Sequence, residues 1–206
     1  MSAIWDKIHA ERADLADFVE GLSDTQLETP SLCGGWSVRD VVGHVISAGN
    51  MSVGGFLGGL IGAGFNFDKY AQKGVDRWHG GTAAELAGKL RATTKLTKAP
   101  PGPKTTWLGE AIVHGEDIRR PLGAKGAYPA DHVTDVLDFY KGSNLLIGAK
   151  KRIAGLNLRA TDIEWSTGTG PEVVGPGYAL ASAMAGRKAA LADLKGEGLE
   201  RFSARF

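Results

Sequence analysis

A stretch of 27 residues, from Val41 to Phe67, contains no Lys, Arg, Asp or Glu. Its length is enough on paper for a helix that crosses a bilayer. However, it also contains eight glycines and five polar side chains, among them His44, and this is too little apolar content for a membrane span. The segment therefore predicts a buried helix followed by a glycine-rich connection, in a protein without a membrane partner.

The composition is that of an ordinary globular protein. The chain has 206 residues, of which 43% are hydrophobic and 23% charged, and this is enough for one good core with a small appendage. The net charge of +1 gives no basic excess for a nucleic-acid partner. A single cysteine, Cys33, excludes an intrachain disulfide and a multi-cysteine zinc site. Together with a charged N-terminal stretch that has no signal-peptide core, it favours a cytoplasmic location.

Hydrophobic periodicity and capping residues predict a helical first part of the chain. Apolar residues at helical spacing indicate a helix over residues 3–21. Capping-box patterns begin at Ser23, Ser37 and Thr82, and the last two open helices over 38–50 and 83–98. A fourth helix runs from about residue 105 to 120, where Pro121 and Gly123 end it, and residues 130–150 look helical again.

The pattern changes after residue 151. The stretch "LNLRATDIEW" alternates like a strand, and "EVVG" is predicted to pair with it as a hairpin. A helix is then expected up to Gly196. The sequence thus predicts a mainly α protein: a four-helix bundle over residues 1–150 and a small α+β segment over residues 151–206, packed on the bundle.

A candidate metal site begins at Glu110 and His114, which lie four residues apart and therefore on one face of the fourth helix. His44, in the middle of the uncharged helix, would supply a third ligand from a facing helix. Two imidazoles and a carboxylate suit Zn²⁺ or a similar divalent ion, and three protein ligands leave positions open for catalysis. The alternative is an ordinary polar patch, because Glu-x-x-x-His occurs by chance in many helices.

Other reactive side chains have competing interpretations. Asp40 is a fourth possible ligand, but its position three residues after Ser37 favours closure of the capping box. Arg119 and Arg120 are candidate contacts for a carboxylate of a substrate or thiol, although favourable charge at the end of a helix explains them equally simply. Cys33 has no neighbouring base in sequence and is interpreted as a small packing residue.

Three stretches resemble the actinobacterial mycothiol-dependent maleylpyruvate isomerase family, which belongs to the DinB-like metal-binding four-helix bundles. They are "PSLCGGWSVRDVVGHV", "GEAIVHGEDIRRPLG" and "GPGYALASAMAGRKAALADLKGEG". The resemblance implies that His44, Glu110 and His114 are the metal ligands and that Asp40 is not. From residue 151 the chain has only 56 residues, which we expect to be fewer than in the family's C-terminal domain. Maleylpyruvate is therefore not carried over as the substrate.

The implied activity is metal-assisted chemistry of mycothiol, the thiol cosubstrate, with a small electrophilic substrate. A metal-bound thiol loses its proton and becomes a nucleophile. It would add to an electrophilic double bond and either leave after rotation, as in an isomerase, or stay, as in an S-transferase. The alternatives are a metal-dependent hydrolase or lyase that uses metal-bound water, and a metal-binding stress protein without turnover. The sequence leaves monomer and homodimer open.

Overall fold

The computed structural model describes residues 3–145 and 147–206, and these fall into two compact units, Met1–Gly126 and Ala127–Phe206. The sequence analysis placed the domain boundary between residues 150 and 151. By contacts, helix α8 (Ala130–Tyr140) belongs to the second unit, because it packs against helix α10 (Gly177–Met184). A folding boundary at residue 150 stays a prediction.

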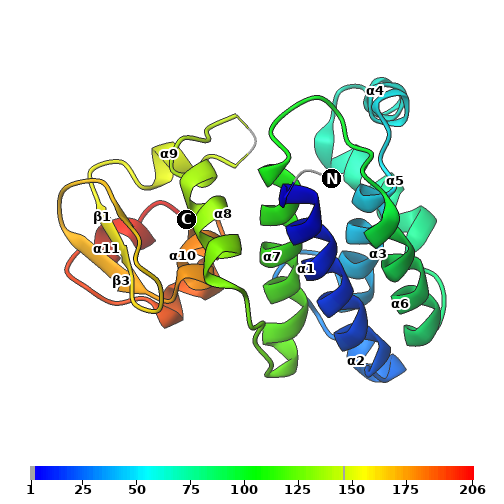
Figure 1. Cartoon of the computed structure of the whole chain (residues 1–206), viewed down its shortest axis with the longest axis horizontal. Coiled ribbons are helices and arrows are strands. Elements are labelled where there is room, and N and C mark those ends of the chain that lie inside the picture. Colours follow the sequence, from blue (N-terminus) through cyan, green and yellow to red (C-terminus); the bar gives the residue numbers. More distant parts are fainter. Residues whose placement is uncertain (1–2, 146) are drawn as a thin grey trace. The chain divides into compact units, whose positions relative to one another are not determined.

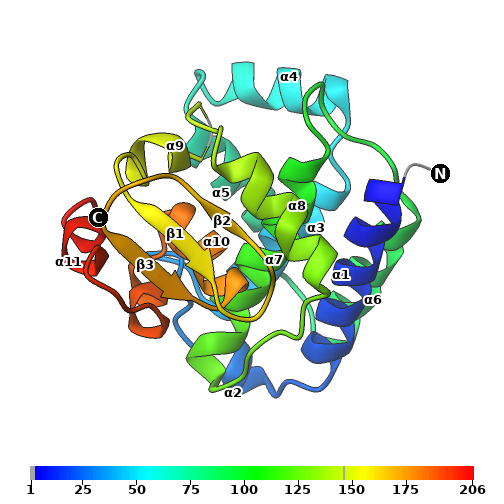
Figure 2. The ribbon, with the colours of Figure 1, turned by 60° about the vertical axis from the view of Figure 1, so that its left-hand side comes forward.

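The first unit is built around four helices that lie side by side (Figure 1; Figure 2). They are α1 (Ala3–Glu20), α3 (Val38–Gly49), α6 (Ala83–Ala92) and α7 (Thr105–Arg119). Their apolar faces form one buried cluster, to which Leu15, Val42, Ile46, Leu86 and Ile118 contribute with no exposed surface. The predicted helix bundle is confirmed.

Capping boxes fix where three of the helices begin. Ser23, Ser37 and Thr82 each form a complete capping box, at the starts of α2 (Asp24–Leu27), α3 and α6. Helix α6 ends earlier than predicted, at Ala92, and continues only as the 3₁₀ turn η1 (Thr93–Lys95). Helix α7 ends as predicted, because the 3₁₀ turn η2 (Arg120–Leu122) contains Pro121 and is closed by Gly123 in the left-handed conformation.

The glycine-rich stretch forms a helix rather than an irregular connection. Helix α4 (Val53–Gly62) is followed by α5 (Phe67–Trp78), which the sequence analysis did not predict and which packs along α3. Gly43 of α3 allows this close approach, because an added Cβ would lie 2.9 Å from backbone atoms of His79. Among residues 3–145 and 147–206, no helix is long and apolar enough to cross a membrane.

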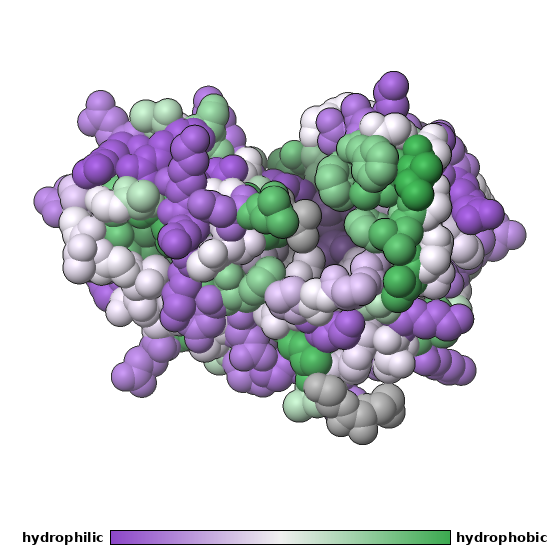
Figure 3. Space-filling model, turned by 90° about the horizontal axis from the view of Figure 1, so that it is seen from above, coloured by the Kyte–Doolittle hydropathy of each residue, from purple (hydrophilic) through white to green (hydrophobic). Residues whose placement is uncertain are grey.

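Helix α4 carries an exposed apolar face. Val53, Leu57 and Ile61 follow one another at four-residue spacing and are 45%, 54% and 63% exposed. Figure 3 shows apolar side chains gathered over this helix. Only Leu60 of α4 is buried, so the helix is held to the bundle by few contacts.

The second unit contains helices and a small sheet, and the three strands lie within the segment 151–206 that was predicted to be α+β. Strand β1 (Asn157–Ala160) lies between β2 (Ser166–Thr167) and β3 (Glu172–Gly175), and α10 contacts β1 and β3 (Figure 2). The remaining elements are α9 (Ala149–Arg152), the 3₁₀ helix η3 (Lys188–Asp193) and α11 (Leu199–Ser203).

Two predictions for this unit are wrong in detail. The strand at 172–175 does not form a hairpin with 157–160, because the two strands run parallel and the antiparallel partner of β1 is the short β2. The helices predicted over 130–150 and up to Gly196 are shorter, ending at Tyr140 and Met184. Gly142 and Gly186 lie two residues beyond these ends, and glycine is common where helices stop.

Candidate metal centre

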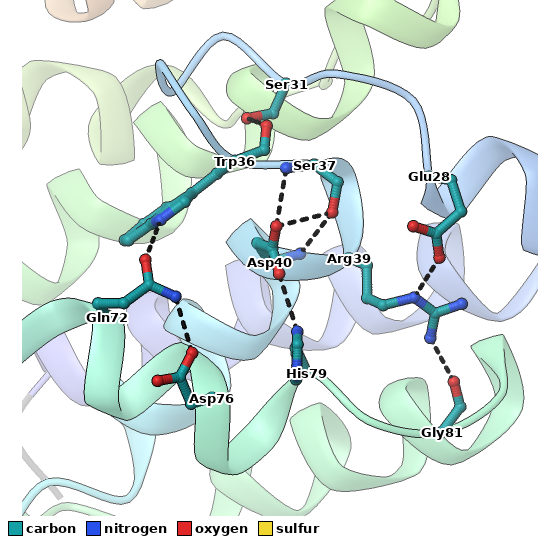
Figure 4. Close-up of polar contacts among 10 residues, drawn as sticks. All are labelled: Glu28, Ser31, Trp36, Ser37, Arg39, Asp40, Gln72, Asp76, His79 and Gly81. Carbon is teal, nitrogen blue, oxygen red and sulfur yellow. Dashed lines mark hydrogen bonds and ion pairs between the residues drawn. The ribbon is translucent and has the colours of Figure 1, made fainter.

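The first turn of α3 is fixed by Asp40, as the capping-box interpretation predicted. Asp40 Oδ2 accepts a hydrogen bond from the backbone N–H of Ser37 at 3.0 Å, and its Oδ1 lies 2.9 Å from Nδ1 of His79 (Figure 4). Burial favours a higher pKa, but these hydrogen bonds outweigh it and hold the pKa of Asp40 below its usual value. Asp40 therefore orients α3 and ties it to the end of α5.

His44 lies one turn further along α3 and is half-buried rather than fully buried. Its ring centre is 5.1 Å from that of Trp36 and 4.9 Å from that of His114, at an interplanar angle of 71° to the latter. Trp36 is held in turn by α5, because its Nε1–H donates to Gln72 Oε1 at 2.9 Å (Figure 4). The structure thus brings together the two histidines that the sequence places 70 residues apart.

His114 is oriented by a carboxylate that the sequence analysis gave no role. Asp117, three residues later on α7, is fully buried, and its Oδ2 lies 2.9 Å from His114 Nδ1. Burial by itself lowers the pKa of His114, but the bonds to Asp117 and Cys33 outweigh it and raise this pKa to about 10. Because a carboxylate only accepts, Nδ1 carries the hydrogen, and a metal would bind at Nε2 by displacing the second proton that the raised pKa keeps there.

Cys33 is also part of this arrangement. Its Sγ lies 3.1 Å from Asp117 Oδ2 and 3.7 Å from His114 Nδ1. Cys33 Sγ, His114 Nδ1 and Asp117 Oδ2 all lie within 4.8 Å of one another and so form an alternative metal-ligand group. The 2.9 Å and 3.1 Å separations are those of hydrogen bonds, so an ion is not needed to explain this group. The interpretation of Cys33 as a simple packing residue was too narrow.

Glu110 precedes His114 by one turn of α7 and is half-buried. Burial raises the pKa of the Glu110 carboxyl to about 7, against the opposing effect of the positive charges of His114 and Arg12. Tyr70 of α5 is close enough to respond to it: burial, and then the charge of Glu110, raise the pKa of the Tyr70 hydroxyl. Glu110 is therefore a carboxylate in a restricted space among α1, α5 and α7.

Arg12 is a further residue that the sequence analysis missed. It is only 2% exposed, and its Nε and Nη1 make no hydrogen bond within the described residues. Burial lowers the pKa of its guanidinium, and the negative charge of Glu110 opposes that shift. The sequence did not indicate that Arg12 is buried near Glu110, because the spacing of the apolar residues around it predicts only a helix.

The spacing of the two histidines is compatible with one divalent ion, although Cys33, His114 and Asp117 are the described residues whose ligand atoms lie within 4.8 Å of one another. Two imidazoles that bind one zinc ion, each at about 2.0–2.1 Å, have ring centres roughly 5 Å apart, and those of His44 and His114 are 4.9 Å apart. Glu110 shares the face of His114 on α7 and would supply an anionic oxygen. The hydrogen bond from His114 to Asp117 is the kind of support that metal-binding histidines commonly have.

The two candidate arginines lie in different surroundings. Arg119 is 3% exposed, its Nη2–H donates to Asp14 Oδ2 at 2.5 Å, and its guanidinium stacks over Phe18 at 5.1 Å. These contacts fasten α7 to α1 and support the interpretation of Arg119 as a structural cation near a helix end. Arg120 is half-buried at the start of η2. A ligand contact by either arginine stays a prediction.

The fold and these residues define a helix-bundle protein in which a histidine of α3 lies against a histidine of α7. The chain belongs to the mycothiol maleylpyruvate isomerase family: the family model described as "Mycothiol maleylpyruvate isomerase N-terminal domain" matches residues 8–119, more than half of the chain. Among curated proteins, none matches this chain.

Two solved structures are similar over nearly the whole length. The crystal structure of the mycothiol-dependent maleylpyruvate isomerase has a TM-score of 0.55 and 13% sequence identity, and 96% of each chain is covered. That of a mutant of the same enzyme has a TM-score of 0.52, 14% identity and the same coverage. At these identities the likeness shows the fold alone. We expected a C-terminal segment shorter than that of the family. This is wrong with respect to these two structures, because 96% of this chain covers 96% of each of theirs.

Proposed function

We propose that this protein is a mycothiol-dependent metalloenzyme, an isomerase or a thiol S-transferase, that acts on a small electrophilic substrate. The observation that carries the proposal is the approach of His44 on α3 to His114 on α7, with Glu110 one turn away, in a chain of the maleylpyruvate isomerase family. Family membership supports mycothiol as the thiol and isomerisation as the reaction. Transfer is the second outcome of the same chemistry.

His44, Glu110 and His114 would hold the divalent ion, with zinc as the expected metal because of the nitrogen and oxygen donors. When bound, such an ion lowers the pKa of a coordinated thiol and so supplies the nucleophile at neutral pH. Asp117 keeps the hydrogen of His114 on Nδ1 and so presents Nε2 to the site. Trp36 lies against the His44 ring and is held there by its hydrogen bond to Gln72.

The reaction itself balances without an external oxidant. The thiol sulfur forms a bond to one carbon of an electrophilic double bond, and the electron pair of that bond moves to the neighbouring acceptor group. The former double bond then rotates. Expulsion of the thiolate restores the double bond in the other geometry, whereas protonation of the carbon leaves a thioether. A cytoplasmic location and the oligomeric state stay predictions.

The test is to incubate zinc-loaded protein with mycothiol and a panel of electrophilic alkenes and to follow both by mass spectrometry. We expect a rearranged substrate with unchanged thiol, or a covalent adduct in the case of transfer. Protein that has been dialysed against a chelator is the matched control and should be inactive. Turnover that is equal with and without mycothiol, or equal after chelation, would contradict the proposal.

A further inference from the structure

A cavity of about 450 Å³ lies in the first unit between the end of α3 and helices α4 and α5. Polar side chains from three segments line it: Ser47 and Asn50 of the α3 end, Ser52 at the start of α4, and Tyr70, Lys73 and Arg77 of α5. Its volume is in the range of small-molecule sites, and several polar groups converge on it.

The cavity is electropositive. Lys73 and Arg77 lie four residues apart on α5, with Tyr70 three residues before Lys73, so all three share one face of the helix. No Asp or Glu is among the described residues that line the cavity. Lys73 donates to the carbonyl oxygen of Gly62 at 2.8 Å, and neither cation forms an ion pair with residues 3–145 or 147–206. Two cations without an acid favour an anion.

The cavity adjoins the candidate metal centre. Ser47, in its wall, lies three residues after His44 on the same face of α3. The backbone of α5 comes close to α3 at this point, because a Cβ added to Gly74 would lie 2.5 Å from Ser47 Oγ. The charge of Glu110 also raises the pKa of the Tyr70 hydroxyl in the cavity wall. The cavity therefore begins about one helical turn from His44.

We propose that this cavity binds an oxyanion group of the substrate, a carboxylate or a phosphate, through Lys73 and Arg77. The reacting carbon of the same molecule then lies toward His44 and Glu110. The Tyr70 hydroxyl donates a hydrogen bond to the part of the substrate between its oxyanion group and its reacting carbon. The statement that the bound anion is part of the substrate rests on the proposed function. The anion site itself is inferred only from the cavity and from Lys73 and Arg77. Arg77 suits the planar oxygen pair of such groups, and Lys73 adds a point charge.

The test is isothermal titration calorimetry of chelator-treated protein with succinate and, separately, with inorganic phosphate. We expect at least one of the two probes to bind, and the double variant Lys73→Gln, Arg77→Gln to bind it at least tenfold more weakly. Lys69→Gln is the matched control, because Lys69 is exposed on the same helix but does not line the cavity. It should change the affinity less than twofold. Binding of neither probe, an undiminished affinity in the double variant, or an equal loss in Lys69→Gln would overturn the proposal.

A second measurement separates this inference from the proposed function. In Glu110→Gln, the anion affinity without metal should be at least that of wild type, because the anion contacts α5 and the substitution removes a negative charge that acts on Tyr70 in the cavity wall. If the anion binds only when zinc is added, it binds the metal and the cavity assignment is wrong. If the anion binds as expected but no thiol chemistry is detected in wild type, the proposed function fails and the anion site stands. Circular dichroism and thermal unfolding confirm that each variant is folded.

Discussion

The rings of His44 and His114 lie 4.9 Å apart and nearly perpendicular to each other, although they come from different helices. This relationship depends on the packing of α3 against α7. The Ser37–Asp40 box fixes the first turn of α3, and the hydrogen bond from His114 to Asp117 fixes the ring on α7. Side chains with such support are held in place before a ligand arrives.

Removing the charge of Asp117 should weaken the metal site without removing a ligand. In Asp117→Asn we expect the affinity for zinc to fall by about 10–100-fold, as is typical when the partner of a metal-binding histidine is changed. Competition with a chromophoric chelator measures this affinity. Asp17→Asn is the control, because Asp17 is a surface residue with a 71% exposed side chain. Equal affinities in wild type and Asp117→Asn would show that Asp117 does not support the site.

Cys33 distinguishes the two possible ligand groups. If the ion is held by His44, Glu110 and His114, Cys33→Ser should retain its zinc, and thiol chemistry should continue because mycothiol provides the nucleophile. If Cys33, His114 and Asp117 are the ligands instead, Cys33→Ser should lose zinc, because serine lacks the thiolate that binds this metal. Zinc per protein after equal dialysis, measured by mass spectrometry of the metal, decides between the two.

Asp40 should contribute to stability in a pH-dependent way. Its folded-state pKa is below its usual value, so its contribution is present above about pH 4 and is lost as the pH falls through the folded-state pKa. At pH 7, Asp40→Ala should lower the free energy of unfolding by about 0.5–2 kcal/mol, because the hydrogen bonds of Asp40 to Ser37 and His79 are lost. Urea unfolding at pH 7 and pH 3 should show this difference shrinking at the lower pH. A difference that is constant or larger at pH 3 would contradict this role.

Close packing of α5 on α3 should make Gly43 intolerant of a side chain. Gly43→Ala should destabilise the protein by about 1–3 kcal/mol, because the new methyl group meets backbone atoms of His79 at 2.9 Å. Gly88→Ala in α6 meets nothing within 4 Å and should stabilise the helix by about 1 kcal/mol. Thermal unfolding of both variants tests the pair. Stabilisation by Gly43→Ala would show that α5 does not pack at this distance.

Local sequence signals predicted most of the first unit. The boxes at Ser37 and Thr82 are short-range patterns, and each begins a helix as expected. The same holds for the end of α7, where Pro121 and Gly123 act locally. Helix α5 was missed although Tyr70, Val75 and Trp78 recur at helical spacing and Asn66 caps its first turn, so the sequence did carry a signal for it. Only Val75 of this helix is fully buried.

Features that depend on tertiary packing were not visible in the sequence. The parallel pairing of β1 with β3 reflects which edge of β1 remains open after β2 has paired, and adjacent strands in sequence suggested a hairpin instead. The four-residue spacing of Glu110 and His114 predicted that these two residues belong to the candidate metal centre. Arg12 and Cys33 reach it only through helix packing and a loop, and the i, i+3 spacing of His114 and Asp117 was the one signal that could have identified Asp117.

If Glu110 helps to hold a metal with His44 and His114, the zinc affinity of Glu110→Gln must differ from that of wild type. The change keeps the size and an oxygen donor but removes the only negative charge of the three side chains. The control is Glu197→Gln, because Glu197 is an exposed glutamate outside the bundle. We expect the zinc affinity to fall at least 10–100-fold in Glu110→Gln, while the fold is retained and the control binds zinc as wild type does. Equal zinc affinity in wild type and Glu110→Gln would contradict it and would make Glu110 an ordinary polar residue of the bundle.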